Sequence, residues 1–401
     1  MKDMPEATIR VGDSLEQLQQ LESESVQTCV TSPPYWGLRD YGVDGQLGLE
    51  TTPDAYVTKL VRIFREVRRV LRDDGTLWLN LGDSYVGGGG YSPGAPSNKT
   101  SISGRRADAL REGGLSPQGN LKPKDLAMMP ARVAMALQAD GWWLRSDIIW
   151  HKPNPMPESV TDRPTSAHEH IFLLSKSKRY FYDADAIREE MKPESKDRYD
   201  YSFGGKKNEE LKEGDNPTAL VGDRDPTDGR NKRDVWTVTT KPFPEAHFAV
   251  YPPDLIAPCI KAGTSAKGAC ASCGAPWERV VDVSGGTTGK SWHDHSKDLS
   301  AGMSQTSMSG GVGAATDENG KAYTRETTGW QPTCDCDADK PVPQTVLDPF
   351  SGAGTTGVVA LATGRHYIGI ELNPEYAAMS ARRMRKEVGE LYCGVSVKPE
   401  Q

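Results

Sequence analysis

Along the first part of the chain, stretches with the apolar pattern of a strand alternate with stretches that have the apolar spacing of a helix. Short apolar runs predict strands, and apolar residues three or four positions apart predict helices. The clearest helix is 56–75, where Val57, Leu60, Phe64 and Val67 lie on one stripe and Gly75 is expected to end the helix. The predicted strands are 7–13, 25–32, 76–82, 142–152 and 168–177, and the other predicted helices are 14–21 and 125–141.

The last part of the chain repeats this alternation. Residues 344–387 predict a strand, a glycine-rich turn, a helix, a strand and a helix. Strands that alternate with helices favour a mostly parallel sheet with helices on both faces. The sequence therefore predicts an α/β fold.

Three stretches interrupt the pattern. Residues 87–106 are rich in glycine and serine, 183–234 are charged and rich in turn residues, and 284–329 are rich in serine, glycine and threonine. Such composition is typical of loops and insertions. We expect them to leave the sheet between its elements.

Composition narrows the class of protein. The chain has 401 residues, enough for one large domain with insertions or for two domains. It has no apolar run of transmembrane length and no signal-peptide centre near its start, so we expect a cytoplasmic protein without a membrane partner. The formal net charge of −7 neither favours nor excludes a nucleic-acid partner, because binding to phosphates needs only a local basic face.

The glycine-rich turn has the spacing of a nucleotide-binding loop. Gly352, Gly354 and Gly357 follow an apolar run, and Glu371 comes 19 residues after Gly352. Glycines let the backbone approach a ligand closely, and an acidic group after the next strand can accept from ribose hydroxyls. The pattern fits any adenosine ligand. Few residues follow Glu371, so we expect the rest of the sheet to come from the N-terminal part of the chain.

A second motif lies near the other end. TSPPYW at 31–36, together with DPFSGAGTT at 348–356, resembles the DNA amino-methyltransferases, and the order of the two motifs resembles their permuted beta group. The resemblance implies a Rossmann-like class I methyltransferase fold and S-adenosylmethionine as methyl donor. It also implies attack by the exocyclic amine of a flipped base directly on the methyl group, in line with its bond to sulfur.

The resemblance also assigns residues to roles. The implied catalytic loop is Ser32, Pro33, Pro34 and Tyr35. Cofactor contacts are implied for Asp13, Thr31, Asp348, Pro349, Phe350, Gly352, Gly354, Thr355, Glu371 and Asn373. Residues 246–264 resemble the segment that closes the cofactor pocket, and 147–177 the segment beside the target base.

The chemistry gives a reason for the paired prolines. An exocyclic amine is a poor nucleophile because its lone pair is delocalised into the ring. Acceptors such as Ser32 Oγ and the Pro33 carbonyl can direct that lone pair, and the prolines keep these acceptors rigid. Tyr35, with Trp36, is expected to stack on a base turned out of the duplex.

Serine at the first position of the tetrapeptide is typical of family members that act on cytosine N4, and aspartate of those that act on adenine N6. We expect cytosine N4, with adenine N6 as the alternative. An RNA methyltransferase, a nicotinamide-dependent oxidoreductase that uses the glycine loop, and a catalytically inactive DNA-binding module remain open at this point.

Four of the seven cysteines form close pairs. The pairs read C-x-x-C and C-x-C, a pattern that can present four thiolates to a tetrahedral zinc ion. No open coordination position is implied, so we expect the zinc to be structural. The expected ligands are Cys270, Cys273, Cys334 and Cys336.

These inferences divide the chain into functional segments. The expected partner is double-stranded DNA, contacted mainly by the target-recognition segment with help from 87–120 and the zinc insertion, and the oligomeric state, monomer or homodimer, stays open. The expected segments are a catalytic half at 1–183, a target-recognition insertion at 184–240, a cofactor-pocket segment at 241–264, a zinc insertion at 265–340 and a cofactor-binding half at 341–401.

Overall fold

The fold is that of a computed structural model. It describes residues 4–38, 42–86, 121–122, 124–190, 230–241, 250–284, 324–337, 340–390 and 392–399. The chain forms two compact units, each described here by itself. The first comprises Met1–Ala186, Arg233–Trp277 and Pro332–Gln401, and the second comprises Ile187–Lys232 and Glu278–Gln331.

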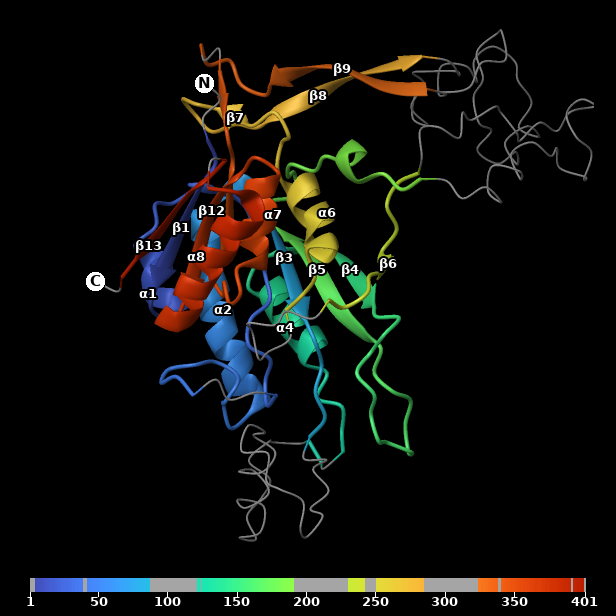
Figure 1. Ribbon diagram of the computed structural model, residues 1–401. Helices are drawn as coiled ribbons and strands as arrows, with labels where there is room; N and C mark the ends of the chain where they lie inside the picture. The colour runs from blue at the N-terminus through green and yellow to red at the C-terminus, as the bar shows by residue number, and fades with distance from the viewer. Residues whose placement is uncertain are drawn as a thin grey trace, which may run out of the picture. The chain divides into compact units, whose positions relative to one another are not determined.

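A sheet of nine strands forms the centre of the first unit (Figure 1). Its order is β13-β1-β12-β11-β2-β3-β5-β4-β6, and neighbours from β13 to β3 are parallel. Only β5 runs against its neighbours. The expected Rossmann-like α/β fold is confirmed. The strands are β1 (Glu6–Val11), β2 (Val26–Thr31), β3 (Leu71–Leu81), β4 (Trp143–His151), β5 (His168–Ser175), β6 (Val235–Thr237), β11 (Thr345–Asp348), β12 (His366–Glu371) and β13 (Gly394–Lys398).

Two rows of helices cover this sheet. One row packs α1 against α2 and α2 against α4, and the other packs α6 against α7 and α7 against α8 (Figure 1). A strand covered on both faces buries the side chains on both of its sides, and every residue of β2 is buried, including the polar Gln27, Thr28 and Thr31. The helices are α1 (Ser14–Gln19), α2 (Pro53–Val70), α4 (Met129–Ala139), α6 (Pro253–Gly263), α7 (Thr355–Ala362) and α8 (Pro374–Val388).

Helix α2 shows how local sequence sets these elements. Thr52 caps its first turn through a hydrogen bond from Ala55 N, and Leu60, Phe64 and Val67 are fully buried in the core. The helix ends at Val70, five residues before the predicted end. Leu71 is already extended and pairs with Val26 of β2, so strand pairing takes over before Gly75 is reached.

The remaining elements are small. In the first unit β7 (Ala269–Cys270) pairs antiparallel with β10 (Pro341–Val342). The short helix η2 is Asp185–Ile187. Strands β8 (Trp277–Ser284) and β9 (Thr324–Pro332) form a two-stranded ribbon, where the Arg279 guanidinium lies 4.6 Å from the Trp330 ring centre. No helix among the described residues is long and apolar enough to cross a membrane.

Candidate active site

The two sequence motifs meet where β2 and β11 lie side by side. Both strands end at the same edge of the parallel sheet, so the loop after Thr31 and the loop after Asp348 are neighbours. Thr31 Oγ1 donates a hydrogen bond of 2.6 Å to Asp348 Oδ1, across 317 positions of sequence. This carboxyl edge, at a point where the chain order reverses, is where open α/β sheets bind ligands.

Asp348 joins several segments at this edge. Its Oδ1 also accepts from Phe350 N (3.0 Å), and its Oδ2 accepts from Thr356 Oγ1 (2.8 Å) and Tyr251 Oη (3.2 Å). The carboxyl group is buried, which raises its pKa, although these hydrogen bonds act in the opposite direction. Sequence reasoning gave Asp348 a cofactor contact. In the structure it ties the catalytic loop, the glycine loop and the 250–264 segment together.

Hydrogen bonds from α2 and within the loop itself hold the catalytic loop in place. Tyr56 Oη donates to the Pro34 carbonyl (2.8 Å), which fixes the second proline against α2. Ser32 Oγ donates to Tyr35 Oη (3.2 Å). Pro33 is buried, and among the described residues no donor is bonded to its carbonyl, so the acceptor capacity of this oxygen is unused.

The two aromatic residues of the loop differ. Tyr35 is half-buried, and a Cβ on Gly82 would lie 2.6 Å from its Cε2, so only glycine lets the ring sit there. Burial, and next the Glu169 carboxylate, raise the pKa of Tyr35 well above its usual range. Trp36 is buried in the core and donates from Nε1 to the Glu50 carbonyl (2.9 Å). The expectation that Trp36 helps to stack on a base is therefore wrong, because its ring is used in packing.

The glycine loop is packed closely against α8. Gly354 has φ +72°, and a Cβ there would lie 2.7 Å from the Cβ of Ser380. Arg383 of α8, itself buried, donates from Nη1 to the Ala353 carbonyl (3.1 Å) and to Thr355 Oγ1 (2.8 Å). Arg383 is a supporting residue that sequence reasoning missed. Arg383 lies on α8, where a charged residue is expected to face solvent.

Glu371 lies at the end of β12 and faces this loop. Its Oε2 accepts from Gly352 N (2.7 Å) and its Oε1 from Asn373 N (3.0 Å). Burial raises the pKa of the Glu371 carboxyl. Asn373 caps α8 by accepting from Glu375 N. The acidic group predicted for ribose hydroxyls is thus beside the loop it was expected to serve.

The turn after β1 completes this edge. Ser14 Oγ donates to the Pro349 carbonyl (2.6 Å), which links the N-terminal turn to the glycine loop. The Asp13 carboxylate accepts from Leu15 N and Glu16 N and so caps α1. Asp13 therefore lies near the loop, with one of its oxygens engaged by the helix.

The four paired cysteines come together away from this edge. Their Sγ atoms all lie within 4.8 Å of one another, and none of the four is in a disulfide. The cluster lies beside β7 and β10, on the side of β11 where that strand begins. Arg72 Nη1, from the start of β3, donates to the Cys273 carbonyl (2.8 Å) and docks the first pair onto the sheet.

The cysteine thiols influence each other. Backbone N–H groups, that of Cys273 first, lower the pKa of the Cys270 thiol to about 6. The neighbouring sulfurs, that of Cys273 first, raise the pKa of the Cys336 thiol to about 12. Closely spaced thiols of this kind have the donor set of a tetrahedral zinc site.

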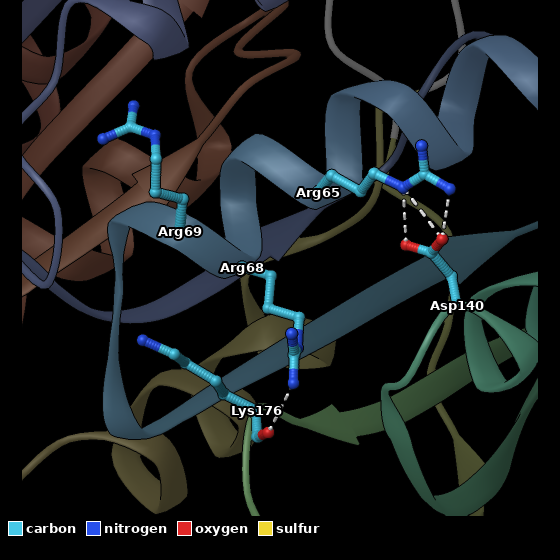
Figure 2. Close-up of a pocket in the computed structure, with 5 residues that line it drawn as sticks. All are labelled: Arg65, Arg68, Arg69, Asp140 and Lys176. Carbon is cyan, nitrogen blue, oxygen red and sulfur yellow. Dashed lines mark hydrogen bonds and ion pairs between the residues drawn. The ribbon is translucent and has the colours of Figure 1, made fainter.

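A basic cavity of about 310 Å³ lies at the opposite end of the strands, near the beginning of β3 and the end of β5 (Figure 2). Arg65 forms a forked contact with Asp140, and Arg68 Nη2 donates to the Lys176 carbonyl (3.4 Å). Arg69 donates to the Leu18 and Leu21 carbonyls. The three arginines are therefore already engaged in contacts within the protein. The cavity also lies at the opposite end of β3 from the catalytic loop.

The stretches expected to read DNA sequence, 87–120 and most of 184–240, lie outside the described residues. The same holds for the serine- and glycine-rich part of the zinc insertion, 285–323.

Comparisons with known proteins agree with the geometry. A family model described as DNA methylase matches residues 26–271 and 340–382. The chain is 40% identical to the type II methyltransferase M.Cfr9I of Citrobacter freundii, over 95% of this chain and 88% of that protein. It is 38% identical to the type II methyltransferase M.SmaI of Serratia marcescens, over 94% of this chain and 90% of that protein.

A solved structure has also been matched. PvuII DNA methyltransferase, described as cytosine-N4-specific, aligns over 98% of this chain and 97% of its own, with 16% identity and a TM-score of 0.48. At this identity and score the likeness assigns neither a base nor a cofactor to this chain.

Proposed function

The chain belongs to the N4/N6 DNA amino-methyltransferase family, and from this premise we propose that it transfers a methyl group from S-adenosylmethionine to the N4 atom of cytosine in double-stranded DNA. Family membership removes the oxidoreductase and RNA alternatives. The observation that carries the proposal is the placement of Ser32 beside the glycine loop, fixed by the Thr31–Asp348 hydrogen bond.

Ser32 and Pro33 have the acceptor roles. The Ser32 hydroxyl oxygen and the Pro33 carbonyl accept hydrogen bonds from the two N–H groups of the amine, so that its lone pair points out of the ring plane. Hydrogen bonds aimed where charge changes in the transition state are most effective when the protein holds them fixed. Pro34, held by Tyr56, and the half-buried Tyr35 ring give the loop that rigidity.

The glycine loop and Glu371 fit an adenosine ligand. The loop approaches α8 so closely that a side chain at Gly354 is excluded, and Glu371 presents a carboxylate next to Gly352. S-adenosylmethionine supplies an electrophilic methyl sulfonium when bound. Glu371 accepts from the ribose hydroxyls, Asp13 lies on the adenine side, and Phe350 with the backbone of Pro349–Thr355 lines the methionine side.

The choice of base rests on Ser32. A neutral hydroxyl stands where adenine-N6 enzymes typically have a carboxylate, and adenine N6 is the alternative target. The relatives' names describe type II methyltransferases and leave the base open.

Nucleoside analysis of methylated DNA distinguishes the two bases. DNA from cells that express the chain is digested and its nucleosides are separated by liquid chromatography with mass detection. We expect N4-methylcytosine from the wild type and much less of it from Ser32→Ala. N6-methyladenine without N4-methylcytosine would assign the alternative base, and sequencing the modified DNA would give the recognition site.

We propose that Cys270, Cys273, Cys334 and Cys336 bind one structural zinc ion. Tetrahedral Zn–S bonds of about 2.3 Å bring four sulfurs to about 3.8 Å from one another, and the four Sγ atoms are already clustered. The ion would join the segment after α6 to the segment before β11. Because Arg72, near the start of β3, donates to the Cys273 carbonyl, we infer that the ion would lie at the amino ends of the parallel strands and take no part in methyl transfer.

DNA recognition is assigned to the inserted segments. Residues 184–234, with help from 87–120 and 265–340, supply polar and basic side chains on segments inserted between the sheet elements. The expected bound at 240 extends too far, because Val235–Thr237 form β6 of the central sheet. The catalytic and cofactor-binding halves are 1–183 and 341–401, joined by the pocket segment 241–264.

A further inference from the structure

Hydrogen bonds lead from the catalytic loop to groups that the proposed function leaves without a role. Ser32 Oγ donates to Tyr35 Oη (3.2 Å), and Tyr35 Oη donates to Glu169 Oε2 on β5 (2.7 Å). The other oxygen of Glu169 forms an ion pair with Lys152 Nζ, just after β4. All of these residues belong to the first unit.

The protons in this chain of bonds have a defined direction. Glu169 Oε2 accepts from both Tyr35 Oη and Asn80 Nδ2 (3.1 Å), and an ionised carboxylate can only accept. Asn80 Oδ1 lies farther from Tyr35 Oη, at 3.4 Å, so the single Tyr35 proton belongs to Glu169. Tyr35 Oη therefore accepts the hydrogen bond from Ser32, and the Ser32 proton points toward Tyr35.

Burial makes this arrangement firm. The side chains of Glu169 and Lys152 are only 15% and 19% exposed, so water screens their interaction little. Asn80 Nδ2 also donates to the His170 carbonyl (3.1 Å), which fixes its amide. Lys152 and Asn80 therefore hold the Glu169 carboxylate in place, and neither of them donates a hydrogen bond to Tyr35.

We propose that Glu169, acting through Tyr35, is a positioning residue that makes Ser32 a hydrogen-bond acceptor toward the exocyclic amine. The inference rests on the proposed role of Ser32. A serine hydroxyl whose proton is free can instead donate to the ring nitrogen beside the amine. It would then bind the base without directing the lone pair of the amine.

Tyr35→Phe tests the inference because it keeps the ring and removes only the hydroxyl. We expect the single-turnover rate of methyl transfer to fall about 10- to 100-fold, while the dissociation constants for DNA and S-adenosylmethionine change less than about twofold. Tyr392→Phe, at a side chain that is 70% exposed, is the matched control and keeps the wild-type rate. Equal rates for Tyr35→Phe and the wild type would overturn the proposal.

The double variant shows whether Tyr35 acts through Ser32. In a Ser32→Ala background, Tyr35→Phe should add no further loss, since the oxygen to be oriented is gone. A full additional loss there would contradict the proposal. A wild-type rate for Ser32→Ala alone would instead contradict the proposed function, so the two failures are distinguishable.

Substitutions of Glu169 give a second readout. Glu169→Gln keeps an oxygen that can accept from Tyr35 and should retain most of the rate, whereas Glu169→Ala should lose as much as Tyr35→Phe. Circular dichroism and thermal melting confirm folding of each variant. Equal loss in both Glu169 variants, or none in either, would show that Glu169 does not orient Ser32.

Discussion

The two ends of the central strands hold their chemical groups in different ways. At the carboxyl edge, Asp348 is already saturated by donors from Thr31, Phe350, Thr356 and Tyr251. On the other side, the four cysteine Sγ atoms lie within 4.8 Å of one another, and backbone N–H groups and neighbouring sulfurs are their partners. Hydrogen bonds within the protein satisfy the first group, whereas we propose that a zinc ion binds the second. The comparison suggests that catalysis depends on internal hydrogen bonds and stability of the insertion on metal.

The largest effect is expected from Asp348→Asn. Asparagine offers one acceptor oxygen and places an amide donor against other donors. We expect the free energy of unfolding to fall by about 3–5 kcal/mol, and methyl transfer to fall at least about 100-fold. Chemical denaturation and a single-turnover assay measure the two. Asp282→Asn, at an exposed position on β8, is the control. Wild-type values for Asp348→Asn would show that Asp348 does not join the loops.

Removing one cysteine ligand should act on stability and spare the chemistry. Cys273→Ala is expected to lose the bound zinc and about 3 kcal/mol of stability, because the ion no longer links the two segments. Metal analysis and thermal melting measure this, with Cys393→Ala as a control outside the cluster. Per folded molecule the rate should match the wild type. A zinc-free wild type, or a variant that folds equally well but has lost activity, would contradict the division between the two edges.

Gly354→Ala tests the close packing of the cofactor loop. The new methyl group would meet Ser380, so we expect the loop to shift and S-adenosylmethionine to bind at least about tenfold more weakly. Calorimetric titration measures the affinity. Gly364→Ala is a matched control, since Gly364 has φ +78° and open space around its Cβ position. If both variants bind equally well, the close approach has no role in binding.

The smallest effect concerns pH. Burial raises the folded-state pKa of Glu371, so the folded protein holds this proton more tightly than the unfolded chain does. Stability should therefore decline as the pH rises from about 4.3, the unfolded value, through the folded pKa. Glu371→Gln should remove this contribution to the pH dependence of stability. Denaturation at several pH values measures it, and an identical slope in both proteins would contradict the burial argument.

The sequence predicted the central sheet well because its signals are local. The strand, glycine turn, helix and acidic residue from 344 to 371 can be read from neighbouring positions alone. The end of α2 was misplaced because pairing of Leu71 with β2 is a tertiary effect. Strand β13 was missed, since its partly exposed residues pair with the distant β1.

The supporting residues of the site were harder to predict. Tyr251, Arg383 and Glu169 act on loops far away in sequence, and Glu169 reads as one acid between two histidines. Trp36 looked like part of the aromatic motif but fills the core. Motifs thus indicate which residues meet a ligand, whereas the residues that hold them in place depend on how the strands are ordered.

A crystal structure with S-adenosylhomocysteine, the product that remains after methyl transfer, tests the central claim most directly. The account predicts that its sulfur lies between Pro33 and Phe350, with its ribose on Glu371. A ligand bound at the opposite end of the strands, near the basic cavity at Arg68 or the cysteine cluster, would contradict it.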